Sequence, residues 1–336
     1  MDLDRIYDPV REDLCALARL IRDELSSDDP FVAELVSHVL TTQGKMIRPA
    51  LVCLSAQASG GPGKKSGRDG SSPEWARLGV AGAVELIHVA SLIHDDVIDA
   101  ADRRRGRASV NALWGNQVAV LLGDYLFSKA FHLLVRLRQD EIAAAVAWAT
   151  TRMSQAEIQQ IKCGNRPHTD EKIYFDIIEG KTAELMSAAC RCGALTTAAA
   201  EDAAAALSTF GLEWGMAFQI TDDALDLTES ADSLGKPIGS DIQTGKMTLP
   251  IIHALTHAPE ADRQRLQEIL HRTDGDHQEG MDDVREILGR CGAIEHALDV
   301  ARLRARRAAA ALDSLERSPA RESLMALVEF VTGRKR

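Results

Sequence analysis

The feature that most constrains the fold is a helical repeat of apolar residues that continues along most of the chain. In the stretch VREDLCALARLIRDEL, apolar side chains recur three and four positions apart, at Leu14, Leu17, Ala18 and Ile21. Hydrophobic residues make up 45% of the 336 residues and aromatic residues only 4%, so the core consists mainly of Ala, Leu, Val and Ile. Alternating strand patterns are largely missing. We therefore predict an all-α bundle of about ten or more helices.

One stretch interrupts the helical pattern. Residues 59–75, SGGPGKKSGRDGSSPEW, are rich in Gly, Ser, Lys and Pro and have no apolar period, which predicts a flexible surface loop. No strand precedes the Gly-Lys pairs and the GxxxxGK[ST] spacing is absent, so a phosphate-binding loop is not favoured. Because neither a domain linker nor a repeat of fixed period is visible, we predict a single domain over residues 1–336.

Charge and cysteine content narrow the functional classes. The formal net charge is −11, which disfavours nucleic-acid binding because phosphate backbones require a basic surface. The six cysteines include no CxxC and no zinc-type spacing, as expected of reduced thiols. The chain opens on the charged segment MDLDRIYDPVRED, and no uninterrupted apolar run of about 18 residues is seen. We expect a cytoplasmic protein without a membrane span.

An acidic cluster ends an apolar helical run at residues 86–107, LIHVASLIHDDVIDAADRRRGR. On a helix, Asp95 and Asp99 share one face, about 40° and about 6 Å apart. Two carboxylates on one face repel each other unless a cation lies between them. Mg²⁺ is commonly bound by one or two protein carboxylates together with water and substrate phosphates. The pair therefore predicts half of a magnesium site.

A second cluster, in QITDDALDL, repeats the DDxxD spacing with Asp222, Asp223 and Asp226. One such motif is weak support for a site, since acidic helix faces are usually only solvated. Two copies, each after an apolar helix and each followed by a basic loop, are much stronger. Facing helices would line one cavity mouth with six carboxylates, which is sensible only with metal ions and a polyanionic ligand.

Basic residues stand close to both clusters in the sequence. Arg offers a fork to phosphate oxygens and Lys a point charge, although any single one is more often a solvated surface residue. Together with the carboxylates they fit two neighbouring diphosphate sites, one bridged by metal and one held by side chains alone. The residues are Lys45, Arg48, Arg104, Arg105, Lys181, Lys236 and Lys246, with Thr182 beside Lys181.

These motifs together resemble those of the trans-isoprenyl diphosphate synthases, in particular the long-chain polyprenyl diphosphate synthases. The matching segments, in order, are GKMIRP, HxxxxxxDDVID, RRG, GDYLF, GKT, QITDDALD and GKPIGSD. The resemblance implies an all-α fold around a deep central cavity, usually as a homodimer. It also implies condensation of isopentenyl diphosphate with an allylic diphosphate such as farnesyl diphosphate.

The resemblance also assigns roles to individual residues. Three Mg²⁺ ions would be bound by Asp95, Asp99 and Asp222, supported by Asp96, Asp223 and Asp226. Arg104, Lys181 and Lys236 would hold the allylic diphosphate, with Lys246 near the closing loop. Thr182 and Gln219 would present dipoles to the allylic cation. Isopentenyl diphosphate would be bound by Lys45, Arg48, His88 and Arg105. His94, about 100° from the metal face, is interpreted as structural.

Product length depends on the depth of the cavity. In the family resembled here, bulky residues four and five positions before the first aspartate often limit chain growth. The small Ser91 and Ala90 stand there in this chain, so a product longer than fifteen carbons is predicted. Phe127, Phe131 or Leu134 is the predicted floor of the cavity.

Three alternatives stand beside this interpretation. A class I terpene cyclase would share the first motif but needs neither the second DDxxD nor a second diphosphate site. A shorter-chain geranylgeranyl or farnesyl diphosphate synthase would differ only in cavity depth. A non-catalytic subunit of a heteromeric synthase would usually lose metal-binding aspartates, and this chain keeps all six. A long product would have to leave into a nearby membrane, so peripheral membrane contact is expected at release.

Overall fold

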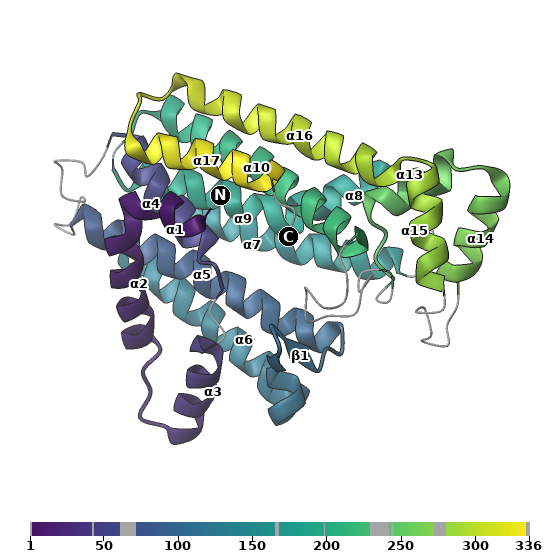
Figure 1. The fold of residues 1–336 in the computed structure, drawn as a ribbon. Coiled ribbons are helices and arrows are strands. Elements are labelled where there is room, and N and C mark those ends of the chain that lie inside the picture. Colours follow the sequence, from purple (N-terminus) through teal and green to yellow (C-terminus); the bar gives the residue numbers. More distant parts are fainter. Residues whose placement is uncertain are drawn as a thin grey trace.

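A computed structural model describes residues 2–41, 44–60, 72–164, 168–197, 199–228, 242, 245–271 and 280–333. This part of the chain is almost entirely helical, which confirms the predicted all-α class (Figure 1). The first half consists of α1 (Leu3–Ile6), η1 (Asp8–Val10), α2 (Arg11–Glu24), α3 (Pro30–Leu40), α4 (Ile47–Ala58), α5 (Pro73–Ile98), β1 (Arg103–Arg104), β2 (Arg107–Ala108), α6 (Val110–Arg136) and α7 (Asp140–Cys163). The second half consists of α8 (Glu171–Ile178), η2 (Glu179–Ala183), α9 (Glu184–Leu195), α10 (Glu201–Thr228), α13 (Leu249–His257), α14 (Glu260–Leu270), α15 (Met281–Arg290), α16 (Ala293–Ala311), η4 (Leu312–Ser314) and α17 (Pro319–Gly333).

Helix α10 connects the three apolar clusters that form the core. Trp214 and Phe210 pack with α4, α5, α6 and α9 in the largest cluster. One turn further along, Ile220 packs with α8, α13 and α16. Leu227 then joins the cluster of α13, α14 and α15 at one end of the molecule (Figure 1). One domain over residues 1–336 stays a prediction, and the continuity of α10 through all three clusters supports it.

Helix α5 carries the first acidic motif, and its ends are encoded locally. Ser72 caps the helix by accepting a hydrogen bond from the backbone N–H of Trp75, and Pro73 occupies the first turn, where no N–H is needed. The helix then runs through the core and ends at Ile98. Asp95 and Asp96 therefore fall in the last turn, where the buried helix emerges toward the cavity mouth.

Among the described residues, two helices are long and apolar enough to cross a membrane, although no uninterrupted apolar run of about 18 residues is seen in the sequence. The most apolar 18-residue window of α5 is 78% buried inside the protein, and that of α6 is 39% buried. A core helix passes the same test of length and composition, and α5 is such a helix. The smaller burial of α6 reflects apolar side chains on its surface, among them Leu121 and Val135.

The sequence indicated no strand, but the RRRGR segment forms a two-residue hairpin ladder between β1 and β2. Arg103 pairs with Ala108 and Arg104 with Arg107. The two residues between them, Arg105 and Gly106, both have positive φ, at 50° and 77°. This is the backbone of a type I′ turn, which matches the twist of a hairpin. The turn holds Arg104 and Arg105 against the end of α5.

Close helix packing depends on glycine at the crossing of α4 and α9. A Cβ at Gly193 would lie 2.2 Å from the carbonyl oxygen of Val52. We expect Gly193→Ala to lower the free energy of unfolding by about 2–3 kcal/mol, because backbone must move. Gly289→Ala is the matched control. Nothing lies within 4 Å of its Cβ position, so a gain of about 0.5–1 kcal/mol is expected from helix propensity. Equal denaturant midpoints for the two variants would contradict this account.

Candidate active site

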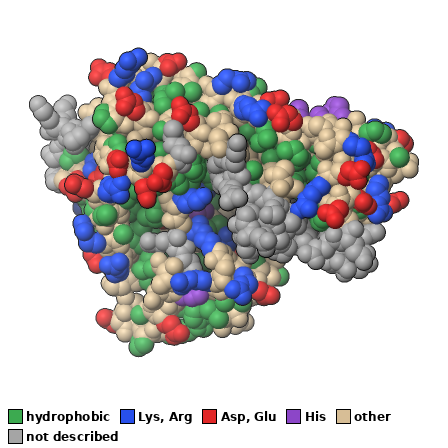
Figure 2. Space-filling view, in the orientation of Figure 1, with side chains coloured by type: hydrophobic (Ala, Val, Ile, Leu, Met, Phe, Trp, Pro, Cys, Tyr) green, Lys and Arg blue, Asp and Glu red, His purple; other side chains and the backbone are tan. Residues whose placement is uncertain are grey.

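A cavity of about 1010 Å³ opens between α4, α5, α6, α7 and α10. Both charged or polar side chains and apolar side chains line its wall. Figure 2 shows Lys and Arg side chains in the central hollow of the surface. The charged and polar group includes Lys45, Arg48, Glu85, His88, Asp95, Arg104, Arg105, Glu157, Lys181, Thr182, Gln219 and Asp222. The apolar group includes Leu92, Phe127, Met153, Ile158, Ile161 and Phe218.

The outer aspartates of the first motif each meet a lysine from a distant helix or loop. Nζ of Lys181 lies 3.5 Å from Oδ2 of Asp95, and Nζ of Lys246 lies 3.0 Å from Oδ2 of Asp99. Burial raises the pKa of Asp95, and the charge of Lys181 opposes that rise. Asp95 thus lines the cavity beside a lysine, whereas Asp99 does not line it and pairs with Lys246 at the end of α5.

Asp96 points the other way and contacts Arg104. Nε of Arg104 donates to both carboxylate oxygens, at 2.8 and 2.9 Å, and Asp96 is 4% exposed. Asp96 was predicted to support the metal ions, but in this structure it does not line the cavity. Its charge fixes the guanidinium of Arg104, which does line it. A buried charge-assisted pair of this kind sets side-chain direction well.

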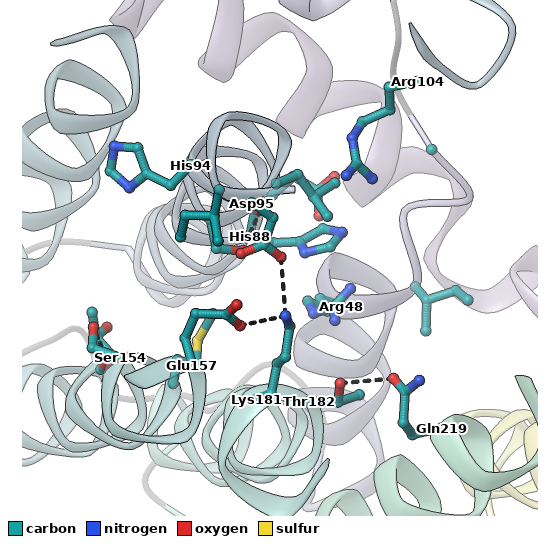
Figure 3. A pocket seen from close by; sticks show the side chains of 18 of the residues that line it. Arg48, His88, His94, Asp95, Arg104, Ser154, Glu157, Lys181, Thr182 and Gln219 are labelled. Atoms are coloured by element: carbon teal, nitrogen blue, oxygen red, sulfur yellow. Dashed lines mark hydrogen bonds and ion pairs between the residues drawn. The ribbon is translucent and has the colours of Figure 1, made fainter. Parts of the chain in front are cut away.

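The second motif divides in a similar way. Asp222 lines the cavity, whereas Asp223 is buried and accepts hydrogen bonds from the hydroxyl of Tyr174 at 2.6 Å and from Nε2 of Gln219 at 2.8 Å. The oxygen of the same Gln219 amide accepts a hydrogen bond from the Thr182 hydroxyl at 2.9 Å (Figure 3). Asp223 therefore positions Gln219, and through it Thr182. Asp226 is half-buried near the end of α10.

Lys181 and Thr182 reach the cavity from a π-helical turn, η2, between α8 and α9. Such wide turns are frequent at functional sites because they re-aim side chains within a continuous helix. A Cβ at Gly180 would lie 2.9 Å from the carbonyl oxygen of Arg152, so glycine lets this turn approach α7 closely. Figure 3 shows Lys181 between Asp95 and Glu157, and it contacts both carboxylates.

Arg48 is a half-buried cation that lines the cavity. Its Nε has no hydrogen-bond partner among the described residues. Burial lowers its pKa to about 10, against the opposing charge of Glu85. Burial likewise raises the pKa of Glu85, and the charges of Arg48 and Arg105 oppose that rise. A guanidinium held charged with an unsatisfied donor indicates a site for an anion.

Two further features complete the basic wall. A Cβ at Gly44 would lie 2.4 Å from a terminal nitrogen of Arg105, so glycine leaves room for the guanidinium in its present position. Lys45 lines the same wall. His88 lines it too, and burial, together with Arg48 and Arg105, lowers its pKa well below the ordinary value. His88 is therefore neutral at physiological pH and offers a hydrogen bond rather than a charge.

His94 has the structural role predicted for it. Its Nε2 lies 3.1 Å from the carbonyl oxygen of Val120 on α6. A Cβ at Gly123 would lie 2.2 Å from the same nitrogen, so the ring packs directly on the α6 backbone. In Figure 3 the ring points away from Lys181. His94 thus joins α5 to α6.

The predicted length-determining residues separate into two groups. Ser91 lines the cavity, with its hydroxyl donating to the carbonyl oxygen of His88 at 2.8 Å. Ala90 is fully buried in the core and does not line the cavity, because it lies about 100° further around α5. Of the three predicted floor residues, Phe127 lines the cavity, whereas Phe131 is 37% exposed and Leu134 is buried in the core.

Of the predicted site residues, Lys236 falls outside the described part of the chain. Three residues of the site were not predicted from the sequence. Glu157, Tyr174 and Glu85 were missed: Glu157 contacts Lys181, Tyr174 holds Asp223, and Glu85 lies beside Arg48. The sequence gives no signal for Glu157, because an acidic residue in a polar helical stretch is usually solvated. The sequence does give a signal for Glu85, since this residue stands three positions before His88 on the same helical face.

A helical cavity with two aspartate motifs, adjacent cations and an apolar wall defines an enzyme that ionises and joins prenyl diphosphates. The family model described as polyprenyl synthetase matches residues 29–288, and the chain belongs to that family. The protein is thus a prenyltransferase, as predicted.

Known relatives and a solved structure align with this protein along its whole chain. The chain is 39% identical to a short chain isoprenyl diphosphate synthase of Methanothermobacter thermautotrophicus, covering 100% of this chain and 98% of the relative. It is 32% identical to octaprenyl diphosphate synthase of Escherichia coli, covering 100% of both. Component 2 of heptaprenyl diphosphate synthase from Bacillus subtilis is also 32% identical, over 100% of this chain and 92% of the relative. A Caulobacter crescentus polyprenyl synthase, solved with calcium and isoprenyl diphosphate, superposes with a TM-score of 0.89 at 31% identity, covering 100% of this chain and 98% of that one.

Proposed function

We propose that this enzyme adds isopentenyl diphosphate units head-to-tail to an allylic diphosphate and yields a long-chain all-trans polyprenyl diphosphate and pyrophosphate. The observation that carries the proposal is that one cavity is lined both by charged side chains and by apolar ones. Asp95 and Asp222, one from each aspartate motif, line it together with several cations, and so do Leu92, Phe127 and Met153. Such a cavity suits two diphosphate heads beside each other and a growing hydrocarbon chain.

The aspartates fit Mg²⁺ as predicted. Asp95, Asp99 and Asp222 offer oxygen donors alone, and hard divalent ions prefer such donors. Two of these carboxylates lie against lysines, so the site already binds positive charge. The Caulobacter structure, solved with calcium and isoprenyl diphosphate, supports a divalent ion together with a prenyl diphosphate. Bound ions, three by our proposal, would neutralise the leaving diphosphate.

The side chains of the cavity carry out the remaining tasks. Arg104 and Lys181, with Lys236 and Lys246, hold the allylic diphosphate, while Lys45, Arg48, His88 and Arg105 bind isopentenyl diphosphate. The C–O bond of the allylic substrate breaks, and pyrophosphate leaves with the electron pair. Thr182 and Gln219 direct their dipoles at the resulting cation, and the apolar wall excludes water. The double bond of isopentenyl diphosphate forms the new C–C bond, and a proton is then lost to the released pyrophosphate.

Phe127 is proposed as the residue that limits chain growth. We expect Phe127→Ala to shift the product distribution upward by at least about one five-carbon unit, because the truncated side chain deepens the cavity. Thin-layer separation of labelled, dephosphorylated products measures the shift. Phe131→Ala is the matched control on the same helix, since Phe131 does not line the cavity. An unchanged distribution in Phe127→Ala would place the floor elsewhere.

A homodimer is proposed from the exposed apolar side chains of α6 and α7. Leu121 is 67% exposed and Trp148 is 59% exposed, and neither lines the cavity. Burying such side chains in a partner contributes about 1.5–3 kcal/mol each. We expect the wild type to sediment as a dimer at micromolar concentration and Trp148→Glu to shift it toward the monomer. Leu303→Glu, at an exposed position of α16, is the control. A monomeric wild type would refute the proposal.

The cytoplasm is proposed as the site of action, with peripheral membrane contact at product release. A polyprenyl chain is insoluble in water, so release into a bilayer favours turnover. Fractionation of cells that express the protein tests the location, and addition of vesicles to steady-state assays tests release. Integral membrane behaviour, resistant to high salt and alkaline carbonate, would contradict this assignment.

The similarity to component 2 of a heptaprenyl diphosphate synthase raises the alternative that this chain works only with a second subunit. Whether the purified chain is active by itself separates the two functions. The test incubates purified protein with farnesyl diphosphate and isopentenyl diphosphate, with Mg²⁺ or with excess chelator. We expect condensation and pyrophosphate release with Mg²⁺ alone, and none with the chelator. Folded protein that is inactive alone but active with a second subunit would favour the alternative.

A further inference from the structure

Three metal-ligating side chains from three helices meet outside the cavity. They are Glu171 at the start of α8, His253 in α13 and His296 in α16, and their ligand atoms all lie within 4.8 Å of one another. The nearest recorded approach is 3.8 Å, between Nε2 of His296 and Oε1 of Glu171. Figure 2 shows histidine side chains gathered on the surface where α13 meets the start of α16. None of the three lines the prenyl cavity.

Core packing fixes the backbone that carries these ligands. Ile252 and Ala297 are sequence neighbours of the two histidines, and both are fully buried in one apolar cluster. Tyr174, three residues after Glu171 and so on the same helical face, belongs to that cluster. The cluster joins α8, α13 and α16. The backbone is therefore already ordered, so ligand binding has little conformational entropy to lose there.

Both histidines have ring nitrogens available for a ligand. Nδ1 of His253 and Nε2 of His296 are buried and make no hydrogen bond among the described residues. The two rings stack at 4.2 Å between centroids, and His257 stacks on the far side of His253 at 4.3 Å. These two ring nitrogens are therefore open to a ligand.

We propose that Glu171, His253 and His296 bind a divalent transition ion of the zinc class, with water as a further ligand. Two imidazoles and one carboxylate are a donor set that suits Zn²⁺, whereas Mg²⁺ prefers oxygen ligands alone. Tetrahedral ligands at about 2.0–2.2 Å from the ion lie roughly 3.3 Å apart. The side chains reach that spacing by rotation, and the histidine rings leave their stack because a metal binds in the ring plane.

The site joins elements that support the catalytic wall. Helix α8 carries Tyr174, whose hydroxyl donates to Asp223, and it continues into the π turn of Lys181 and Thr182. An ion between α8, α13 and α16 therefore stabilises this wall without touching substrate. The proposal stands apart from the prenyltransferase function, because zinc binding here needs neither diphosphate nor Mg²⁺.

Calorimetry with Zn²⁺ on the chelator-treated full chain tests the site. Excess Mg²⁺ is kept present so that zinc does not compete at the carboxylates of the cavity. We expect about one Zn²⁺ per chain, and at least about 100-fold weaker binding in His253→Ala, in His296→Ala and in Glu171→Gln. His271→Ala is the matched control, because His271 is exposed and its ring lies against a backbone carbonyl of its own helix. The control should bind like the wild type.

Two further readouts keep the result interpretable. Co²⁺ in place of Zn²⁺ should give the intense visible bands of a tetrahedral site in the wild type and in His271→Ala only. The thermal unfolding temperature should rise when zinc is added to those two proteins and stay unchanged in the three ligand variants. Variants with wild-type unfolding in the absence of metal have intact folds. The proposal is overturned if the wild type binds no zinc under Mg²⁺, or if the ligand variants bind it as tightly.

Discussion

Replacing Asp95 by Asn is expected to lower the turnover number about 10³-fold, the largest effect of any single change proposed for this enzyme. The carboxylate lies at the cavity beside Lys181 and is one of the three that we propose as Mg²⁺ ligands. Losing several kcal/mol of charge stabilisation at the leaving diphosphate corresponds to this factor. Single-turnover formation of labelled product, at saturating Mg²⁺ and substrates, measures the chemical step directly.

The fold of Asp95→Asn should remain intact. Burial raises the pKa of Asp95, so the folded protein already disfavours its charge, and a neutral isostere costs little. Asp102→Asn is the matched control, because Asp102 is exposed three residues beyond Asp99. It should turn over like the wild type. Near-normal turnover in Asp95→Asn would remove this residue from the metal site.

Replacing Arg48 by Met should raise the KM for isopentenyl diphosphate by roughly 10–150-fold. Hydrogen bonds to a charged group contribute about 1.5–3 kcal/mol, which sets this range. The KM for the allylic substrate should change much less, because in our proposal Arg104 and Lys181 hold that diphosphate. Initial rates at varied concentrations of each substrate separate the two constants.

The same Arg48→Met variant should remain folded but lose some stability. Burial opposes the charge of Arg48, as its lowered pKa shows, but its loss leaves the buried Glu85 with the charge of Arg105 alone. Arg306→Met, at an exposed position of α16, should leave both constants unchanged. Equal rises in the two KM values would mean that Arg48 does not distinguish the diphosphates.

Much of the fold follows from the sequence, since helical periodicity and a core of small apolar residues predict an all-α bundle. The RRRGR hairpin was missed, because its two-residue ladder depends on backbone conformation at Arg105 rather than on a strand pattern. The aspartate motifs pointed to the cavity, since Asp95 and Asp222 both line it. Spacing alone did not show that Asp96 and Asp223 turn aside to orient Arg104 and Gln219, because partners from distant segments decide those directions.

Cavity depth was the least predictable feature. Ala90 and Ser91 are both small, yet only Ser91 faces the cavity. The contribution of α7 had no sequence signal, since Ile158 and Glu157 look like any residues of an amphipathic helix. These positions become visible only when α7 is packed against the π turn at Gly180, which the three-dimensional fold determines.

Product length tests the central claim most directly. Purified protein would be incubated with Mg²⁺, farnesyl diphosphate and labelled isopentenyl diphosphate, and the products separated by chain length. We predict a ladder that extends past 20 carbons and ends at a long-chain product. A stop at 20 carbons would keep the chemistry but contradict the long-chain assignment, and folded protein that forms no product would contradict the claim that this chain is by itself a synthase.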